Sequence, residues 1–145
     1  MIYCDSSFLV SLYLPNDAFY AQAGQEVKKF KHSVPYTLLN ELEIVTTLQR
    51  ALAQHRLSKP LFDTILRQIA MDEANAFLKS ASVDHNDVHR HAIKLSKQYT
   101  SQFLCRTLDI LHVASAIAVN ASSFASFDNR QRSLAAAAGL TLVPA

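Results

Sequence analysis

The sequence predicts an α/β fold, a three-layer α/β/α arrangement in which a short parallel sheet of four or five strands is covered by helices. Two observations lead to this prediction. Short apolar runs alternate along the chain with longer amphipathic stretches, which is the order that a parallel sheet with helical crossovers requires. The 145 residues contain no linker, repeat or low-complexity segment, so we expect a single domain over residues 1–145.

The first part of the chain is predicted to alternate between strands and helices. In order, the expected elements are a strand at 2–4, a helix at 8–14, a helix at 18–31, a strand at 32–36, a helix from 38 to about 56 and a helix that starts near 58. Ser6-Ser7 and Thr37 are expected to cap the helices that follow, because a hydroxyl there can accept from a free backbone N–H. Pro35 is expected at one end of its strand, because proline has no N–H to donate to a sheet.

The second part continues the alternation after one ambiguous stretch, residues 76–83, which fits either a helix end or a short strand. The elements expected after it are a helix at 85–99, a helix at 108–120, a strand at 123–127, a helix at 129–138 and a strand at 140–143. Asp84 and Thr107 are the expected helix caps. Gly139 is expected to end the last helix, because glycine readily adopts the positive φ of that position.

Composition narrows the possible functions. The formal net charge of +2 permits a nucleic-acid partner without requiring one. The only glycines, Gly24 and Gly139, exclude a glycine-rich phosphate loop. The N-terminus lacks the basic segment of a signal peptide, and no apolar run is long enough to span a membrane. The isolated Cys4 and Cys105 suit a reducing compartment, so we expect a cytoplasmic protein that does not bind membranes.

Acidic residues stand where a parallel sheet places its ligands. Asp5 directly follows the first strand and Asp128 directly follows the strand at 123–127. Ligands bind outside the carboxyl ends of parallel strands, so the two carboxylates are expected at the same edge of the sheet. Each aspartate, taken alone, is equally explained as a helix cap.

Two further acids are candidates for the same place. Asp109 lies in the first turn of a helix that is otherwise almost entirely apolar, so its carboxylate is expected to be partly desolvated. A simple interaction with the helix dipole is the alternative. Glu41 and Glu43 both lie early in the helix after Thr37, and spacing alone does not decide between them.

Converging carboxylates without a compensating lysine or arginine repel one another. A hard divalent cation relieves that repulsion, and ligands that are all oxygen suit Mg²⁺ or Mn²⁺ rather than zinc. Such a site polarises a phosphoryl oxygen and lowers the pKa of a bound water. The pattern therefore points to hydrolysis of phosphodiester bonds.

Four segments together resemble the PIN domain, and within it the VapC-type ribonuclease toxins of bacterial toxin–antitoxin pairs. They are Met1–Ser7, Leu39–Glu43, Thr107–Ala116 and Phe127–Arg132, in the family's order and over essentially the whole chain. The resemblance implies a PIN-like fold and Mg²⁺-dependent endonucleolytic cleavage of RNA, with Mn²⁺ as a possible substitute. It also implies a homodimer and inhibition by a small cognate antitoxin.

The resemblance assigns roles residue by residue. Asp5 and Asp109 match the principal metal-binding acids, and Asp128 matches the fourth acid. Glu43, rather than Glu41, matches the acid on the helix after the second strand. Ser6 or Ser7 matches the small hydroxyl residue that forms hydrogen bonds within the site.

Other signals leave alternatives open. Arg130 begins beside Asp128 and could contact substrate phosphate or pair with a carboxylate. His112, three residues after Asp109, could support the site or be a satisfied core histidine. Two rival functions are a catalytically silent PIN-fold interaction module and a phosphotransfer domain of the receiver type. The second would need a lysine near the last strand, where Thr141–Pro144 has none.

Overall fold

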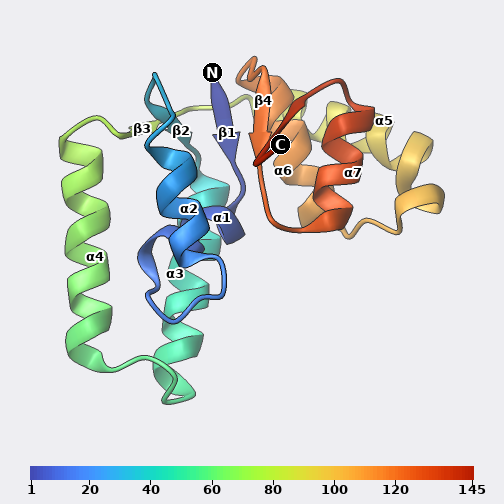
Figure 1. Ribbon diagram of the computed structural model, residues 1–145. Coiled ribbons are helices and arrows are strands. Elements are labelled where there is room, and N and C mark those ends of the chain that lie inside the picture. The colour runs from blue at the N-terminus through green and yellow to red at the C-terminus, as the bar shows by residue number, and fades with distance from the viewer.

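The computed structural model describes all 145 residues and contains seven helices and five strands (Figure 1). The strands are β1 (Ile2–Cys4), β2 (Val34–Tyr36), β3 (Leu78–Ser80), β4 (Ser123–Ala125) and β5 (Thr141–Val143). The helices are α1 (Ser6–Tyr13), α2 (Tyr20–Val27), α3 (Leu38–Ala53), α4 (Lys59–Ala74), α5 (His85–Phe103), α6 (Thr107–Ala118) and α7 (Asn129–Ala137). None of these helices has the length and apolar character needed to cross a membrane.

All strand pairs are parallel, as the alternation of elements predicts. They form two ladders, one in the order β1-β4-β5 and one joining β2 to β3. The break falls between β1 and β2, and Pro35 explains it. Val34 N donates to Phe77 O and Ala81 N donates to Tyr36 O, so Val34 and Tyr36 direct their backbone groups to β3. The backbone of Pro35 must then face β1, where proline has no N–H to donate.

The expectation that Pro35 lies at one end of its strand is wrong, because it is the middle residue of β2. A side chain instead serves the free carbonyl at the end of β1. The Asn40 amide donates from Nδ2 to Cys4 O at 3.1 Å. This contact ties α3 to β1 across the gap between the two ladders.

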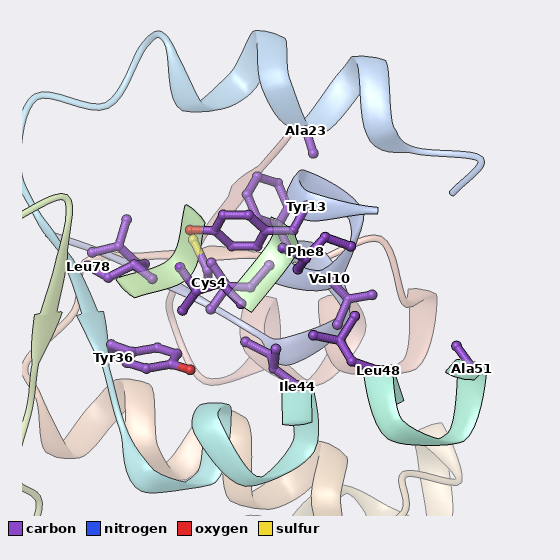
Figure 2. Close-up of a cluster of buried hydrophobic side chains, with 14 of the residues drawn as sticks. Cys4, Phe8, Val10, Tyr13, Ala23, Tyr36, Ile44, Leu48, Ala51 and Leu78 are labelled. Atoms are coloured by element: carbon purple, nitrogen blue, oxygen red, sulfur yellow. The ribbon is translucent and has the colours of Figure 1, made fainter. Parts of the chain in front are cut away.

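Alternate residues of β1 point into two hydrophobic clusters, because successive side chains of a strand face opposite sides. Cys4 belongs to a cluster formed mainly by α1, α3, α4, β2 and β3 (Figure 2). Tyr3 belongs to a second cluster formed with α5, α6, α7 and β4. Figure 1 accordingly shows β1 and β4 between helices α1 to α4 on one side and α5 to α7 on the other, which agrees with the predicted layering.

Helix starts agree with the sequence in most places and differ in two. Thr37, Ser58, Asp84 and Asp128 are N-caps whose side chains accept from backbone N–H groups. The cap of α1 is Asp5 rather than a serine, and the residue before α6 is Arg106 rather than Thr107. The ambiguous stretch at 76–83 contains strand β3, and α2 is shorter than the predicted helix at 18–31.

Candidate active site

An open cleft of about 500 Å³ lies at the carboxyl ends of β1 and β4. Its polar lining comes from α1, α3, α6, α7 and the segment before α2, and it contains no lysine or arginine. The polar lining residues are Ser6, Ser7, Ser11, Asp17, Glu43, Thr47, Asp109, His112, Asp128 and Gln131. Three of the predicted acids thus face one cavity, and the fourth, Asp5, lies beside it.

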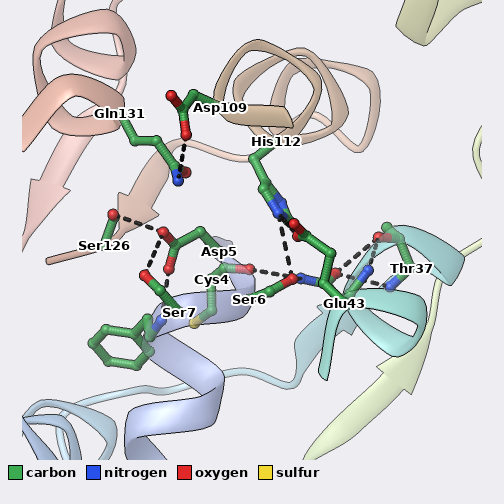
Figure 3. Close-up of polar contacts among 12 residues, drawn as sticks. Cys4, Asp5, Ser6, Ser7, Thr37, Glu43, Asp109, His112, Ser126 and Gln131 are labelled. Atoms are coloured by element: carbon green, nitrogen blue, oxygen red, sulfur yellow. Dashed lines mark hydrogen bonds and ion pairs between the residues drawn. The ribbon is translucent and has the colours of Figure 1, made fainter. Parts of the chain in front are cut away.

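Asp5 is completely buried, and its carboxylate is held by three donors. Phe8 N donates to Oδ1 at 2.7 Å, while the Ser7 and Ser126 hydroxyls each donate to Oδ2 at 2.8 Å (Figure 3). Burial raises the pKa of Asp5, and His112 and the three hydrogen bonds lower it by less. Asp5 is therefore rigidly placed, and its negative charge is costly where it stands.

Asp109 is buried at the third position of α6, and each carboxylate oxygen has one donor. Arg106 N donates to Oδ2 at 2.8 Å, and Gln131 Nε2 donates to Oδ1 at 3.2 Å. The other end of the Gln131 amide is unusual. Its Oε1 is the one buried side-chain polar atom of the chain without a hydrogen-bond partner. A buried free acceptor is costly, and a bound water or ion beside Asp109 would satisfy it.

Asp128 caps α7 and connects to the other aspartates through hydrogen bonds. Its Oδ1 accepts from Arg130 N and Gln131 N, and its own N–H donates to Ser126 Oγ at 3.0 Å. Ser126 thus links Asp128 to Asp5, and Gln131 links Asp128 to Asp109. Arg130 pairs with Asp128 Oδ2 at 3.8 Å, which is the second of its two predicted roles.

Glu43 is held differently, by a side chain from another helix. His112 Nε2 contacts the Glu43 carboxylate and lies 3.3 Å from Ser6 Oγ, while Nδ1 lies 3.0 Å from the Tyr3 hydroxyl. A carboxylate only accepts, so Nε2 carries the proton shared with Glu43. Half-burial raises the pKa of Glu43, but the hydrogen bond and charge of His112, helped by Ser6, bring it below its ordinary value.

The three aspartates share one structural feature, which is that each sits at a helix N-terminus. Asp5 and Asp128 cap α1 and α7, and Asp109 lies in the first turn of α6. The helix-cap explanation of Asp5 and Asp128 and the helix-dipole explanation of Asp109 are therefore correct, and they are compatible with a shared site. Three positive helix ends converge on the carboxylates and partly offset their mutual repulsion. Figure 3 shows Asp5 between the Asp109–Gln131 pair and the Glu43–His112 pair.

The donor chemistry of these residues fits Mg²⁺ or Mn²⁺. Each carboxylate has about four acceptor positions. The hydrogen bonds of the three aspartates leave one position free on Asp5 and two each on Asp109 and Asp128. All are oxygen ligands, which hard cations prefer. As the side chains stand, no three His, Cys, Asp or Glu residues are arranged to hold a metal ion. Binding would therefore require the carboxylates to turn toward a common point.

Three residues of this network were not found from the sequence. Ser126 and Gln131 link the aspartates, and Asn40 connects α3 to β1 and Ser6. Ser126 could have been predicted from the sequence. It is a small hydroxyl residue at the end of a strand and close to an acid, and Ser6 and Ser7 have the same relation to Asp5. Gln131 had none, because a glutamine in the first turn of a helix is ordinary. Ser6 and Ser7 both take part, Ser7 through Asp5 and Ser6 through His112.

Comparisons with known proteins agree with this fold. The family model of the PIN domain matches residues 2–137. The structure resembles that of VapC20 of Mycobacterium tuberculosis, described as a sarcin-ricin loop cleaving toxin, with a TM-score of 0.71, 17% identity and 97% of each chain covered. It also resembles VapBC2 of Rickettsia felis bound to a promoter DNA fragment, with a TM-score of 0.66, 15% identity and coverage of 98% of this chain and 97% of that one. No curated protein sequence matches the chain.

Proposed function

The chain belongs to the PIN domain family, and on that basis we propose that it is a Mg²⁺-dependent endoribonuclease that hydrolyses RNA phosphodiester bonds. One observation carries the proposal. Asp109, Asp128 and Glu43 line one cleft that has no lysine or arginine in its lining. Asp5 lies beside the cleft and is linked to Asp128 through Ser126. Such a cluster is chemically reasonable when a divalent cation shares it.

In this proposal Asp5 and Asp109 would hold the cation directly, because each keeps a carboxylate acceptor position that no hydrogen bond occupies. A bound Mg²⁺ or Mn²⁺ would polarise the phosphoryl oxygen and make water a better nucleophile. Glu43, oriented by His112, accepts a hydrogen bond from the attacking water, and its lowered pKa keeps it ionised for that role. Asp128, at the start of α7, also orients water, and Arg130 contacts the substrate phosphate.

The biological role that we propose is that of the toxin in a toxin–antitoxin pair, acting in the cytoplasm. One structural relative is described as an RNA-cleaving toxin and another as a VapBC complex, and the fold is the same. Exposed apolar side chains support protein partners, namely a small antitoxin and a second copy of the chain. Leu38 and Leu42 on α3 and Leu108 on α6 are 68%, 66% and 48% exposed.

A cleavage assay on purified protein tests the enzymatic proposal. We expect single-stranded RNA to be cut internally with Mg²⁺, and cutting to stop with EDTA and resume when Mg²⁺ or Mn²⁺ is added in excess. Glu43→Gln should slow this cleavage. Glu41→Gln is the matched control and should not, because Glu41 lies on the same helix but is exposed. An intact chain that leaves RNA uncut under all of these conditions would favour the silent interaction module.

Growth arrest tests the biological role. Induced expression should stop growth, and Asp109→Asn should restore it while the protein accumulates to the same level. Arrest by the Asp109→Asn variant would contradict a nuclease-based toxicity.

A further inference from the structure

Four phenylalanines form a series of stacked pairs that runs from the core to the cleft. Phe30 and Phe8 are near-parallel with centroids 6.2 Å apart, Phe8 and Phe127 follow at 5.2 Å, and Phe127 and Phe19 at 4.3 Å with an angle of 6°. Phe8 is fully buried, whereas Phe127 is partly buried and lines the cleft. The series ends at Phe19, in the segment between α1 and α2.

Phe19 is the exposed end of this series. Its side chain lines the acidic cleft, and the residue is 42% exposed. A ring stacked on Phe127 at 4.3 Å and 6° is covered by it on one face only. The ring is thus available to a ligand beside the cleft that holds Asp109 and Asp128. The neighbouring Tyr20 is equally exposed, at 43%, but does not line the cleft.

The cleft offers a nucleic acid little other attraction. No lysine or arginine lines it, and of the two arginines of α7 only Arg130, which is 40% exposed, could reach a phosphate at its edge. Arg132 donates to Ser126 O and Pro144 O, and Arg130 pairs with Asp128. A polyanion bound here needs a source of affinity beyond that one exposed arginine. Stacking of a base on an aromatic ring supplies one, because every base has a π-face.

We propose that Phe19 is a base-stacking platform, which receives one unpaired base of single-stranded RNA next to the phosphate to be cleaved. The inference rests on the proposed nuclease function and adds a residue outside the acidic cluster that binds its substrate. Bases within a duplex are stacked on both faces already, so Phe19 selects against double-stranded RNA. Stacking is tolerant of base identity, so Phe19 contributes affinity and strand selectivity rather than sequence recognition.

A single-tryptophan reporter tests the stacking. The chain contains no tryptophan, so Phe19→Trp introduces a unique fluorophore at the platform. In an Asp109→Asn background, which prevents cleavage, a six-nucleotide single-stranded RNA should quench this fluorescence. The same RNA with its bases removed should quench it far less. Tyr20→Trp is the matched control, and RNA should leave its fluorescence nearly unchanged.

Kinetics with an intact active site provide a second readout. Phe19→Leu keeps an apolar side chain but removes the ring, and it should raise KM for single-stranded RNA about tenfold with a much smaller change in kcat. Phe19→Trp keeps an aromatic ring at this position, so its KM should be close to that of the wild type. An unchanged thermal midpoint for Phe19→Leu separates this effect from misfolding.

The stacking proposal and the nuclease proposal fail in different ways. Equal quenching of the Phe19→Trp and Tyr20→Trp reporters, equal quenching by intact and base-free RNA, or an unchanged KM in Phe19→Leu would overturn the stacking platform while cleavage persists. Selective quenching in a protein that never cuts RNA would preserve the platform and overturn the nuclease.

Discussion

The two sides of the cleft hold their acids by different means. Asp5, Asp109 and Asp128 accept backbone N–H groups at the starts of helices, from residues two or three positions away. Glu43 lies inside α3 and is held by His112, which is 69 residues distant in the sequence. The aspartates are placed by local backbone geometry, whereas Glu43 is placed by tertiary packing.

The pKa values differ in the same way. Burial raises the pKa of Asp5, whose donors are neutral, while the His112 contact outweighs burial and lowers the pKa of Glu43. The ionised form of Asp5 is thus destabilised by burial, whereas the ionised form of Glu43 is stabilised by His112. The difference predicts which substitutions affect chemistry, folding or both.

The largest effect is expected from the two aspartates that line the cleft at the starts of α6 and α7. Asp109→Asn and Asp128→Asn should each reduce RNA cleavage by about 100-fold or more, because the first removes the charge of a metal ligand and the second removes the carboxylate that orients water. Asparagine caps helices nearly as well as aspartate, so folding should change little. Cleavage rates and thermal midpoints measure the two effects.

Asp84→Asn is the matched control for that experiment. Asp84 caps α5 with the same type of hydrogen bonds, to Asn86 N and Asp87 N, and does not line the cleft. The Asp84→Asn variant should cleave RNA at the wild-type rate. Equal loss of activity in Asp84→Asn and Asp128→Asn would mean that the aspartates serve only as caps.

The next effect concerns the partner of Glu43. His112→Asn shortens the side chain and removes the contact, which should reduce cleavage about 10- to 100-fold, as is common for residues that orient a functional group. The pKa of Glu43 should rise, because burial persists without the opposing contribution of His112. NMR titration of the glutamate carboxyl measures it, with His85→Asn on the exposed start of α5 as control. An unchanged Glu43 pKa would contradict this role.

Stability should respond to pH with opposite signs at the two acids. For Asp5, the raised pKa means that stability falls as pH rises above the ordinary value of 3.8 and stays reduced at neutral pH. Asp5→Asn should therefore raise the thermal midpoint of metal-free protein by about 3 °C at pH 7. This gain should disappear in acid.

For Glu43, the lowered pKa contributes stability that is present above 4.5 and is lost as pH falls through the folded value. Glu43→Gln should lower the midpoint by about 3 °C at pH 7 and have no effect at low pH. Shifts of the same sign for Asp5→Asn and Glu43→Gln, measured in EDTA, would contradict the comparison.

The smallest effect is expected at Arg130. Its pairing with Asp128 spans 3.8 Å and its side chain is 40% exposed, so the pair contributes little to stability. Arg130→Ala should leave the thermal midpoint unchanged and raise KM for RNA about threefold, through a lost phosphate contact. Raised salt should diminish the difference. Arg90→Ala, at an exposed site on α5, should leave KM unchanged.

The same contrast explains how far the sequence could predict the site. Helix caps are local patterns, so the positions of Asp5, Asp109 and Asp128 could be predicted from residue type and order. The choice between Glu41 and Glu43 could not be made from spacing, because it depends on His112 arriving from α6. The resemblance to a family was needed there. Gln131 was missed for the same reason, since only folding brings it to Asp109.

The fold shows a similar division. Hydrophobic alternation predicted four of the five parallel strands and most helix starts, and it left the stretch that contains β3 ambiguous. The break between β1 and β2 follows from which way the backbone of Pro35 faces, and that depends on its pairing with β3. No local pattern carries this information.

Calorimetric titration with Mn²⁺ tests most directly whether the four acids form one metal site. We expect saturable binding to the wild-type chain and to Asp84→Asn, with binding lost in Asp5→Asn and Asp109→Asn although both remain folded. Equal Mn²⁺ affinity in wild type and Asp109→Asn would contradict this expectation.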